Sequence, residues 1–263
     1  MTALFYLGTH QPGWLAAATV PLFVSDRRLR GYRHLPRASA AWALDSGGFT
    51  ELATHGSWSH GPTPCQYVAR IRRYRDEIGR LTWAAPQDWM CEPWIVAKTG
   101  LSVAEHQRRT VANYQQLHDL APDLPIVPVL QGWTVADYLR CADRYISAGV
   151  DLTAAPLVGL GTVCRRQSTA DAGRIIGALH AAGIRRLHGF GFKVLGLRRY
   201  SHLLASADSM AWSVEARRSA PLPGCTRHIN CANCPRYAYR WRDQVLAAIA
   251  TPAAEQLALF DVA

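Results

Sequence analysis

Three aspartates stand where the sequence could place catalytic carboxylates, each at the end of a short apolar run or within it. Asp45 begins an Asp-Ser-Gly-Gly-Phe segment, Asp88 lies in Pro-Gln-Asp-Trp, and Asp208 lies in Ala-Asp-Ser-Met. A carboxylate can attack an anomeric carbon while a second carboxyl group serves as acid and base. Taken singly, each aspartate is better explained as a helix cap or a turn residue. Together they predict an active site.

An amide side chain and several glycines occur at positions of the same kind. Gln131 and Gly132 follow one apolar run, and Gly159 begins a Gly-Leu-Gly segment at the end of another. Asp and Gln side chains match the donor and acceptor edges of a flat heterocycle, and glycines allow its plane to approach the backbone. With arginines nearby to bind phosphates, these residues indicate glycosyl transfer at a purine in a nucleic acid.

A group of possible metal ligands lies near the C-terminus. Cys225, His228, Cys231 and Cys234 follow one another at intervals of three residues. Thiolates with an imidazole are typical ligands of a structural zinc ion with tetrahedral coordination. The spacing therefore predicts a zinc site, and buried free thiols are the alternative. The other four cysteines are scattered along the chain and are expected in the core.

The candidate active-site residues need a scaffold that gathers the ends of several strands. Eight apolar runs predict strands at 4–7, 22–24, 42–44, 81–85, 126–130, 152–158, 187–190 and 207–212. Apolar residues at three- and four-residue steps predict helices within 67–78, 102–117, 134–149 and 168–183. Ser102, with Glu105 three residues later, has the pattern of a capping box. The alternation indicates an α/β fold, a TIM-like (β/α)8 barrel with its chemistry at the carboxyl ends of the strands. Because the first three connections are irregular, a distorted or incomplete barrel is the alternative.

The domain organisation follows from this placement of the strands. The barrel is expected to occupy residues 1–220, and residues 221–250 are expected to form the zinc-binding turn and a helix packed on the barrel. Residues 251–263 are expected to be a C-terminal tail. Little room is left for a separate nucleic-acid-binding domain, so a nucleic acid would have to bind on the barrel and on the zinc turn.

Composition limits the partners that this chain can have. The 263 residues carry a formal charge of +10, and all but two of the 29 basic residues are arginines. The planar guanidinium suits phosphate oxygens, so the surplus favours a nucleic acid, whereas a coding bias would explain arginine over lysine but not the net charge. The candidate phosphate contacts are Arg165, Arg166, Arg217 and Arg218. The 49% of hydrophobic residues excludes a disordered or collagen-like chain.

Two further features concern the cellular compartment. No run approaches the roughly 18 apolar residues that a membrane-spanning helix needs. Seven cysteines are an odd number, and their clustering suits a reducing compartment better than a set of disulfides. We therefore expect a cytoplasmic protein with no membrane partner.

The motifs together resemble a known enzyme superfamily. The Asp-Ser-Gly-Gly-Phe segment, the strand end at Asp88, Leu-Gln-Gly at 130–132, Gly-Leu-Gly at 159–161 and the late Asp208 occur in the order found in tRNA-guanine transglycosylases. The chain departs from those enzymes at Thr50, where they usually carry Gln, and in the residues around Asp208. With its shorter length and its Gly-Thr-His-Gln-Pro-Gly start at residue 8, the chain is most similar to the DpdA-type DNA 7-deazaguanine transglycosylases of phages and bacterial genomic islands.

This resemblance implies a pentosyltransferase reaction and a role for each matching residue. Asp208 would attack C1′ of a deoxyguanosine in DNA, and Asp45 would act as general acid and base. The incoming base would be a 7-deazaguanine such as 7-cyano-7-deazaguanine (preQ0). The residues expected around the base are Asp88, Gln131, Gly132, Gly159, Ser46, Gly47 and Phe190, with His10 and Trp14 as further candidate pocket walls. The resemblance also implies a bacterial cell or phage-infected host, and partner proteins of a DNA-modification system.

Some alternatives stay open from the sequence. The same chemistry could act on tRNA, and a non-catalytic nucleic-acid-binding barrel could have kept the fold and the zinc, although retention of all three aspartates argues against that. The family's zinc site has three cysteines and a histidine downstream of them. No histidine follows His228 here, so His228 is the expected fourth ligand and His202 is the alternative.

Overall fold

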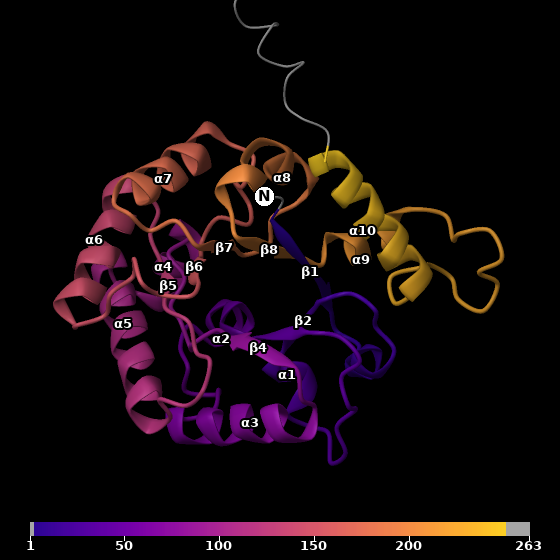
Figure 1. Cartoon of the computed structure of the whole chain (residues 1–263), viewed down its shortest axis with the longest axis horizontal. Coiled ribbons are helices and arrows are strands. Elements are labelled where there is room, and N and C mark those ends of the chain that lie inside the picture. Colours follow the sequence, from indigo (N-terminus) through magenta and orange to yellow (C-terminus); the bar gives the residue numbers. More distant parts are fainter. Residues whose placement is uncertain (1–2, 251–263) are drawn as a thin grey trace, which may run out of the picture.

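The computed structural model describes residues 3–250, in which eight parallel strands form one sheet that curls into a barrel surrounded by helices (Figure 1). The order across the sheet is β4-β3-β2-β1-β8-β7-β6-β5, so the first and last strands of the chain are neighbours. The edges of the sheet meet at a bridge, where Ala84 N–H donates to Pro125 O and Val127 N–H donates to Ala84 O. The predicted α/β barrel is confirmed, with its seam between β4 and β5. The strands are β1 Leu4–Thr9, β2 Leu22–Ser25, β3 Trp42–Asp45, β4 Leu81–Ala84, β5 Val129–Leu130, β6 Val158–Leu160, β7 Leu187–Gly189 and β8 Ser206–Ser209.

Most of the helices lie outside the ring of strands and connect them, whereas the short helix that follows β3 is seen within the ring (Figure 1). The four predicted barrel helices correspond to α3, α5, α6 and α7, the helix predicted within 221–250 corresponds to α10, and the chain has shorter helices at its irregular connections. Within the described residues the α-helices are α1 Asp26–Leu29, α2 Gly48–His55, α3 Pro64–Glu77, α4 Pro93–Thr99, α5 Val103–Leu120, α6 Val135–Ser147, α7 Ala170–Ala181, α8 Val194–Tyr200, α9 Ala211–Arg218 and α10 Pro235–Ala250.

Hydroxyl side chains begin the long helices. Thr63 and Thr134 each form a complete capping box with the residue three positions later. Ser102 forms half of the predicted box, because its side chain accepts from the Glu105 N–H. The Glu105 carboxylate instead accepts hydrogen bonds from Arg108 and Arg109.

Three predicted strands differ from the structure by more than two residues at one end, and the other five differ by one or two. The run 126–130 contributes only Val129–Leu130, because Pro125 and Pro128 cannot donate hydrogen bonds to a neighbouring strand. The run 152–158 is mostly a loop, in which the Asp151 carboxylate accepts from the N–H groups of Thr153 and Ala154, and β6 begins only at its last residue. The run 207–212 ends as a strand at Ser209, and α9 begins two residues later.

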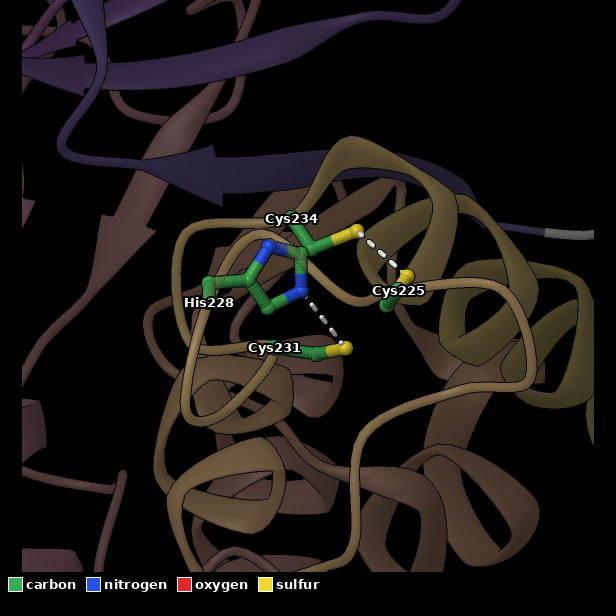
Figure 2. Close-up of side chains that lie close together, drawn as sticks. All are labelled: Cys225, His228, Cys231 and Cys234. Atoms are coloured by element: carbon green, nitrogen blue, oxygen red, sulfur yellow. Dashed lines mark hydrogen bonds between the residues drawn. The ribbon is translucent and has the colours of Figure 1, made fainter.

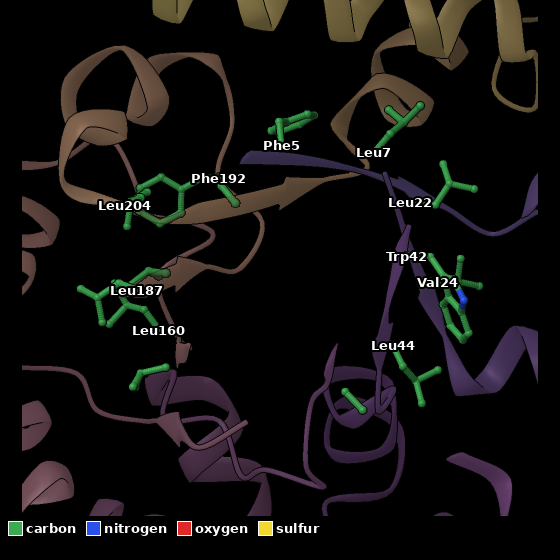
Figure 3. Packing of buried hydrophobic residues seen from close by; sticks show 14 of the residues in the cluster. Phe5, Leu7, Leu22, Val24, Trp42, Leu44, Leu160, Leu187, Phe192 and Leu204 are labelled. Atoms are coloured by element: carbon green, nitrogen blue, oxygen red, sulfur yellow. The ribbon is translucent and has the colours of Figure 1, made fainter. Parts of the chain in front are cut away.

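Alternation along the strands produces two apolar layers. Phe5 and Leu7 of β1 point to the helices and join the large core between sheet and helices (Figure 3). Tyr6, between them, points to the interior of the barrel with Phe23 of β2 and Trp83 of β4. The Tyr6 and Trp83 ring centroids are 5.9 Å apart. Aromatic rings therefore fill the barrel interior below its mouth.

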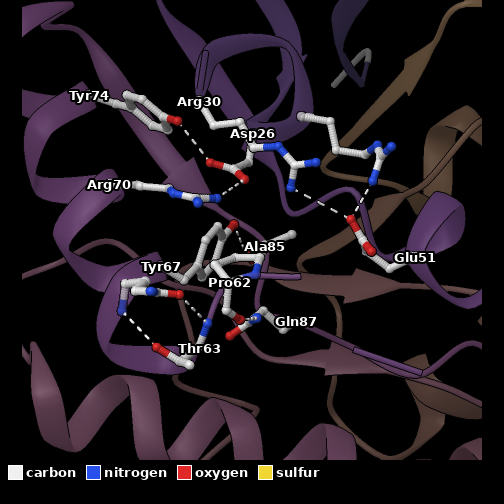
Figure 4. A network of polar contacts seen from close by, with 12 residues as sticks. Asp26, Arg30, Glu51, Pro62, Thr63, Tyr67, Arg70, Tyr74, Ala85 and Gln87 are labelled. Carbon is white, nitrogen blue, oxygen red and sulfur yellow. Dashed lines mark hydrogen bonds and ion pairs between the residues drawn. The ribbon is translucent and has the colours of Figure 1, made fainter. Parts of the chain in front are cut away.

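A buried polar network fixes the irregular connections between β2 and α3 (Figure 4). The Asp26 carboxylate, fully buried, accepts from Arg70 Nη1 and from the Tyr74 hydroxyl, both at 2.8 Å. Beside it, the buried Glu51 carboxylate pairs with Arg27 and lies 3.7 Å from Arg30. These ion pairs hold the short helices α1 and α2 in place, where few backbone hydrogen bonds are available.

The C-terminal helix α10 lies against the barrel beside β1 and α9 (Figure 1). Tyr237 and Trp241 both donate to the carboxylate of Glu215 on α9, each at 3.0 Å. Trp241 also packs on Phe5, with ring centroids 6.1 Å apart. The predicted tail at 251–263 lies outside the described residues. No helix within residues 3–250 is long and apolar enough to cross a bilayer.

Candidate active site and metal-binding turn

The three predicted aspartates come together at one end of the barrel. Asp45 ends β3, Asp88 follows β4, and Asp208 lies in β8, so all three are at the mouth formed by the carboxyl ends of the strands. Burial raises the pKa of Asp45, and the negative charge of Asp208 raises it further. Asp45 in turn contributes to raising the pKa of Asp88. The three carboxyl groups therefore interact electrostatically across the mouth.

Asp208 is held by contacts to one of its two oxygens. Its Oδ1 accepts a 2.9 Å hydrogen bond from Gly191 N–H and lies 3.3 Å from His188 Nε2. His188 Nδ1 is 2.8 Å from the Ser206 hydroxyl, so a ring protonated at Nε2 can accept from Ser206 and donate to Asp208. Within residues 3–250, no hydrogen bond reaches Oδ2. Oδ2 is thus the oxygen of Asp208 that no group of the described chain holds.

His188 is a site residue that its type and position in the sequence did not single out. It is fully buried and lies among the interior rings, with its centroid 4.5 Å from that of Trp83 and 4.8 Å from that of Phe190. The two-residue repeat of β7 could have placed His188 on the inner face with Phe190. Only the fold reveals that Asp208 is its partner.

Asp88 belongs to a buried chain of hydrogen bonds. Gln131 Nε2 donates to Asp88 Oδ2 at 2.5 Å, and Thr162 Oγ1 donates to Gln131 Oε1 at 2.5 Å. Thr162 Oγ1 also accepts from Cys91 N–H at 2.8 Å and lies 3.4 Å from a carboxylate oxygen of Glu92. Burial raises the pKa of Asp88 to about 7, against the opposing effect of the hydrogen bond from Gln131. Gln131 is fully buried, and both ends of its amide are engaged, so it orients Asp88.

The loop that carries Asp88 is fixed from several sides. The backbone oxygen of Asp88 accepts from Trp58 Nε1 at 3.1 Å, and Trp89 N–H donates to Thr110 Oγ1 at 2.9 Å. On the preceding residue, Gln87 Nε2 donates to Pro62 O at 2.6 Å (Figure 4). Burial also raises the pKa of Glu92, whose carboxylate feels the positive charges of the arginines after β6. Glu92 and Thr162, which no motif indicates, therefore complete the site.

The predicted glycines allow close packing at the mouth. Gly47 adopts a left-handed φ of 83° at the start of α2. A Cβ at Gly48 would lie 3.1 Å from Asp88 Oδ1, and one at Gly159 would lie 2.7 Å from the Phe190 ring. Gly132 is packed against the first turn of α6, where a Cβ would be 2.7 Å from that of Asp137.

The remaining predicted pocket residues divide between the mouth and the core. Ser46 is buried at the mouth, and its hydroxyl has no hydrogen-bond partner within the described chain. Phe190 is half-buried and packs on Phe23. Trp14 is half-buried and stacks on Trp212, with ring centroids 5.4 Å apart, which makes it a packing residue of the outer layer.

The cysteine turn brings four potential ligand atoms together (Figure 2). The ligand atoms of Cys225, His228, Cys231 and Cys234 all lie within 4.8 Å of one another. Cys225 Sγ is 3.9 Å from Cys234 Sγ, and His228 Nε2 is 3.2 Å from Cys231 Sγ. His202 lies apart, in a short 3-10 helix at Ser201–Leu203. The group could hold a metal, and of the two candidate histidines it includes His228.

The cysteine turn is attached to the strand that carries Asp208. Ser213 Oγ, on α9 directly after β8, donates to Ala232 O at 2.9 Å. His10, at the carboxyl end of β1, shares a hydrogen bond with Asn233. Trp212 Nε1 donates to Gly8 O at 2.8 Å. A folded turn therefore supports β1 and β8 where they approach the mouth.

Positive charge is concentrated in the last third of the described chain. Residues 175–250 contain eleven Arg and Lys residues against three Asp and Glu residues, which gives +8 of the formal charge. The arginine–carboxylate ion pairs of the described chain involve arginines at 27–174 only. Arg217 and Arg218 are exposed on α9, and Arg165 is exposed after β6. Within the described chain, no ion pair with a carboxylate therefore neutralises the arginines of residues 175–250.

Comparison with known proteins identifies one family. The family model DpdA, described as "DeoxyPurine in DNA protein A", matches residues 1–260, nearly the whole chain. No curated protein matches the sequence.

Proposed function

The chain belongs to the DpdA family, and from this membership we propose that it is a DNA guanine transglycosylase that replaces guanine in DNA with a 7-deazaguanine base such as preQ0. The observation that carries the proposal is the meeting of Asp45, Asp88 and Asp208 at the barrel mouth, with Asp208 held through only one oxygen. The excess positive charge of residues 175–250 supports DNA as the polymer.

In the first step, Asp208 Oδ2 attacks C1′ of the target nucleotide. The bond between C1′ and the guanine nitrogen breaks as the ester bond to Asp208 forms, and Asp45 gives a proton to the departing base. The raised pKa of Asp45 favours the protonated form that this step requires. Gly191 N–H and His188 act as positioning groups, because they fix the carboxylate of Asp208 through Oδ1.

In the second step, the incoming deazaguanine displaces Asp208. Asp45, now ionised, removes the proton from the ring nitrogen that attacks C1′, and the Asp208 carboxylate is released. Two displacements at the same carbon retain the β configuration, as in retaining glycosidases. The same two residues therefore serve both half-reactions, with Asp45 returned to its protonated form.

The base would lie in the mouth beside Asp88 and the glycines. Asp88, with a pKa of about 7, can exchange between a donor and an acceptor form near neutral pH. Gly159 lets the Phe190 ring pack close to the backbone at the mouth, and Ser46 offers a buried hydroxyl without a partner within the described chain. For a duplex target, the base must be extruded, which costs a few kcal/mol and is offset by these contacts.

The cysteine turn would hold a structural zinc ion. Three thiolates and one imidazole are a donor set that zinc prefers, and all four belong to Cys225, His228, Cys231 and Cys234. A bound zinc would supply no chemistry to the reaction but would fix the turn. Through Ser213 and His10, the turn then stabilises the neighbourhood of Asp208.

The test is a base-exchange assay with labelled guanine on duplex DNA and, in parallel, on tRNA. We expect incorporation into DNA, and its loss in Asp208→Asn and in Asp45→Asn. Asp171→Asn, a change at an exposed aspartate of α7, is the matched control and should exchange guanine normally.

Each other outcome removes a defined part of the proposal. Exchange on tRNA alone would refute DNA as the substrate. Unchanged exchange in Asp208→Asn would refute the assignment of the nucleophile. Binding of DNA with no exchange by any preparation, in the presence of guanine or preQ0, would indicate a non-catalytic barrel.

A further inference from the structure

Two tryptophans at the barrel mouth are exposed, whereas the tryptophans in the strands and the first one in the loop after β4 are buried. Trp94 in the first turn of α4 is 38% exposed, and Trp133 between β5 and α6 is 37% exposed. Trp42, Trp83 and Trp89 are each at most 7% exposed. Trp94 and Trp133 both lie on loops that follow strands, so they are on the same face of the barrel as the catalytic aspartates.

Two consecutive arginines stack on these two tryptophans. Arg165 Cζ is 5.3 Å from the ring centroid of Trp94, and Arg166 Cζ is 4.2 Å from that of Trp133. Because the arginines are neighbours in the loop after β6, they join the two rings into one strip, which we call the Trp–Arg strip (Trp94, Arg165, Arg166 and Trp133). Within residues 3–250 neither arginine forms an ion pair.

The Trp–Arg strip continues to the predicted base-binding site. The Trp94 ring meets the edge of Phe49, with centroids 5.8 Å apart. Phe49 directly follows Gly48, whose Cα–H side faces the Asp88 carboxylate. A strand of nucleic acid with one base near Asp88 would therefore have its neighbouring nucleotides over the strip.

Flat rings and guanidinium planes with positive charge match one ligand chemistry, that of unpaired nucleotides. Aromatic side chains stack on bases that have lost their neighbours, and arginines contact both bases and phosphates. Extrusion of a target base leaves adjacent bases without a stacking partner. Trp and Arg are also enriched at protein interfaces, but the position of the strip beside the candidate active site favours a nucleic acid.

We propose that the Trp–Arg strip binds the unpaired bases next to the target nucleotide by stacking. The proposal rests on the proposed function, since it takes DNA as the polymer at the mouth. It assigns Trp94 and Trp133 to binding of the flanking nucleotides and not to the exchange chemistry itself.

The test compares two labelled strands of equal charge by fluorescence anisotropy, (dT)12 and a 12-residue abasic strand. We expect Trp94→Ala and Trp133→Ala each to raise the Kd for (dT)12 about fivefold or more, the range found for single stacked bases. The Kd for the abasic strand should change less than about twofold. Ile146→Ala, at an apolar residue 60% exposed on the opposite end of α6, is the control and should change neither value.

A second variant separates stacking from folding. Trp94→Phe retains a flat ring, so its Kd for (dT)12 should stay within about threefold of the parent value, and thermal unfolding should confirm that every variant is folded. Equal weakening for both strands would overturn the proposal in favour of a phosphate contact. Unchanged binding of (dT)12 by both alanine variants, or no binding of (dT)12 by the parent chain, would also overturn it.

These outcomes are distinguishable from failure of the proposed function. Loss of (dT)12 binding in the variants, together with no guanine exchange by the parent chain, would leave the strip in place and refute the transglycosylase. Guanine exchange on duplex DNA with unchanged (dT)12 binding in the variants would support the transglycosylase and refute the role of the strip.

Discussion

Thr162 offers the sharpest test of the buried chain of hydrogen bonds behind Asp88. Its hydroxyl accepts from Cys91 N–H and donates to Gln131 Oε1, and all three residues are buried. Thr162→Val keeps the size and shape of the side chain but removes the hydroxyl. The change therefore leaves two buried polar groups without a partner and creates no cavity.

The expected magnitude follows from the two orphaned groups. Each buried donor or acceptor left unsatisfied costs about 1–3 kcal/mol, so Thr162→Val should lower the free energy of unfolding by about 2–6 kcal/mol. Thr162 has a left-handed φ of 55°, but valine is branched in the same way, so the backbone strain is the same in both proteins. Thr162→Ser is the matched control, because it keeps the hydroxyl and loses only one methyl group, worth about 1 kcal/mol.

The assay is urea denaturation followed by circular dichroism at neutral pH. We expect the valine variant to be less stable than the serine variant by at least about 1 kcal/mol. A difference below about 0.5 kcal/mol would refute the reasoning, because that is within the usual effect of surface changes. In that case the hydroxyl would not be the shared partner of Cys91 and Gln131.

Four further predictions concern single residues. Burial raises the pKa of Asp88 from 3.8 to about 7, so the free energy of unfolding should fall as the pH rises through that interval. Urea denaturation between pH 4 and 8 should show a smaller fall in Asp88→Asn than in the parent chain. Cys231→Ser should lower both the zinc content by mass spectrometry and the unfolding temperature, whereas unchanged zinc would contradict the metal assignment. His188→Leu should reduce kcat of guanine exchange about tenfold with little change in KM, since it removes one donor to the nucleophile, and equal loss in KM would argue against a positioning role. Asp26→Asn should destabilise the fold by about 1.5–3 kcal/mol, measured by urea denaturation, because the partly exposed Arg70 loses its charged partner. A loss below about 0.5 kcal/mol would exclude that role.

The parts of the fold that could be predicted are those that local patterns determine. Thr134 begins α6 through a capping box, and the apolar period of the helix is visible in the sequence. The end of β3 could be located because Asp45 is a polar residue at the limit of an apolar run. These signals depend on neighbours a few residues apart, which the sequence displays directly.

The parts that could not be predicted depend on contacts between distant loops. Cys91 N–H and Thr162 Oγ1 are 71 residues apart in the chain, and no spacing rule connects them. Likewise, the link between His188 and Asp208 exists only because β7 and β8 are paired. The strand predicted at 126–130 was too long for a local reason. A count of apolar residues ignores Pro125 and Pro128, which cannot donate backbone hydrogen bonds.

The pairing of β1 with β8 explains why the metal-binding turn lies where it does. β1 and β8 come from opposite ends of the chain, so no short loop joins them, and their backbone pairing holds them side by side. Side-chain contacts reinforce this pairing: Trp212 Nε1 donates to Gly8 O, the rings of Trp14 and His10 stack on Trp212, and His10 also contacts Met210 and Asn233. Trp212 belongs to α9, which begins three residues after Asp208, and Asn233 belongs to the turn between Cys231 and Cys234. The metal-binding turn is therefore placed to fix the pair of strands, β1 and β8, that carries the proposed nucleophile Asp208.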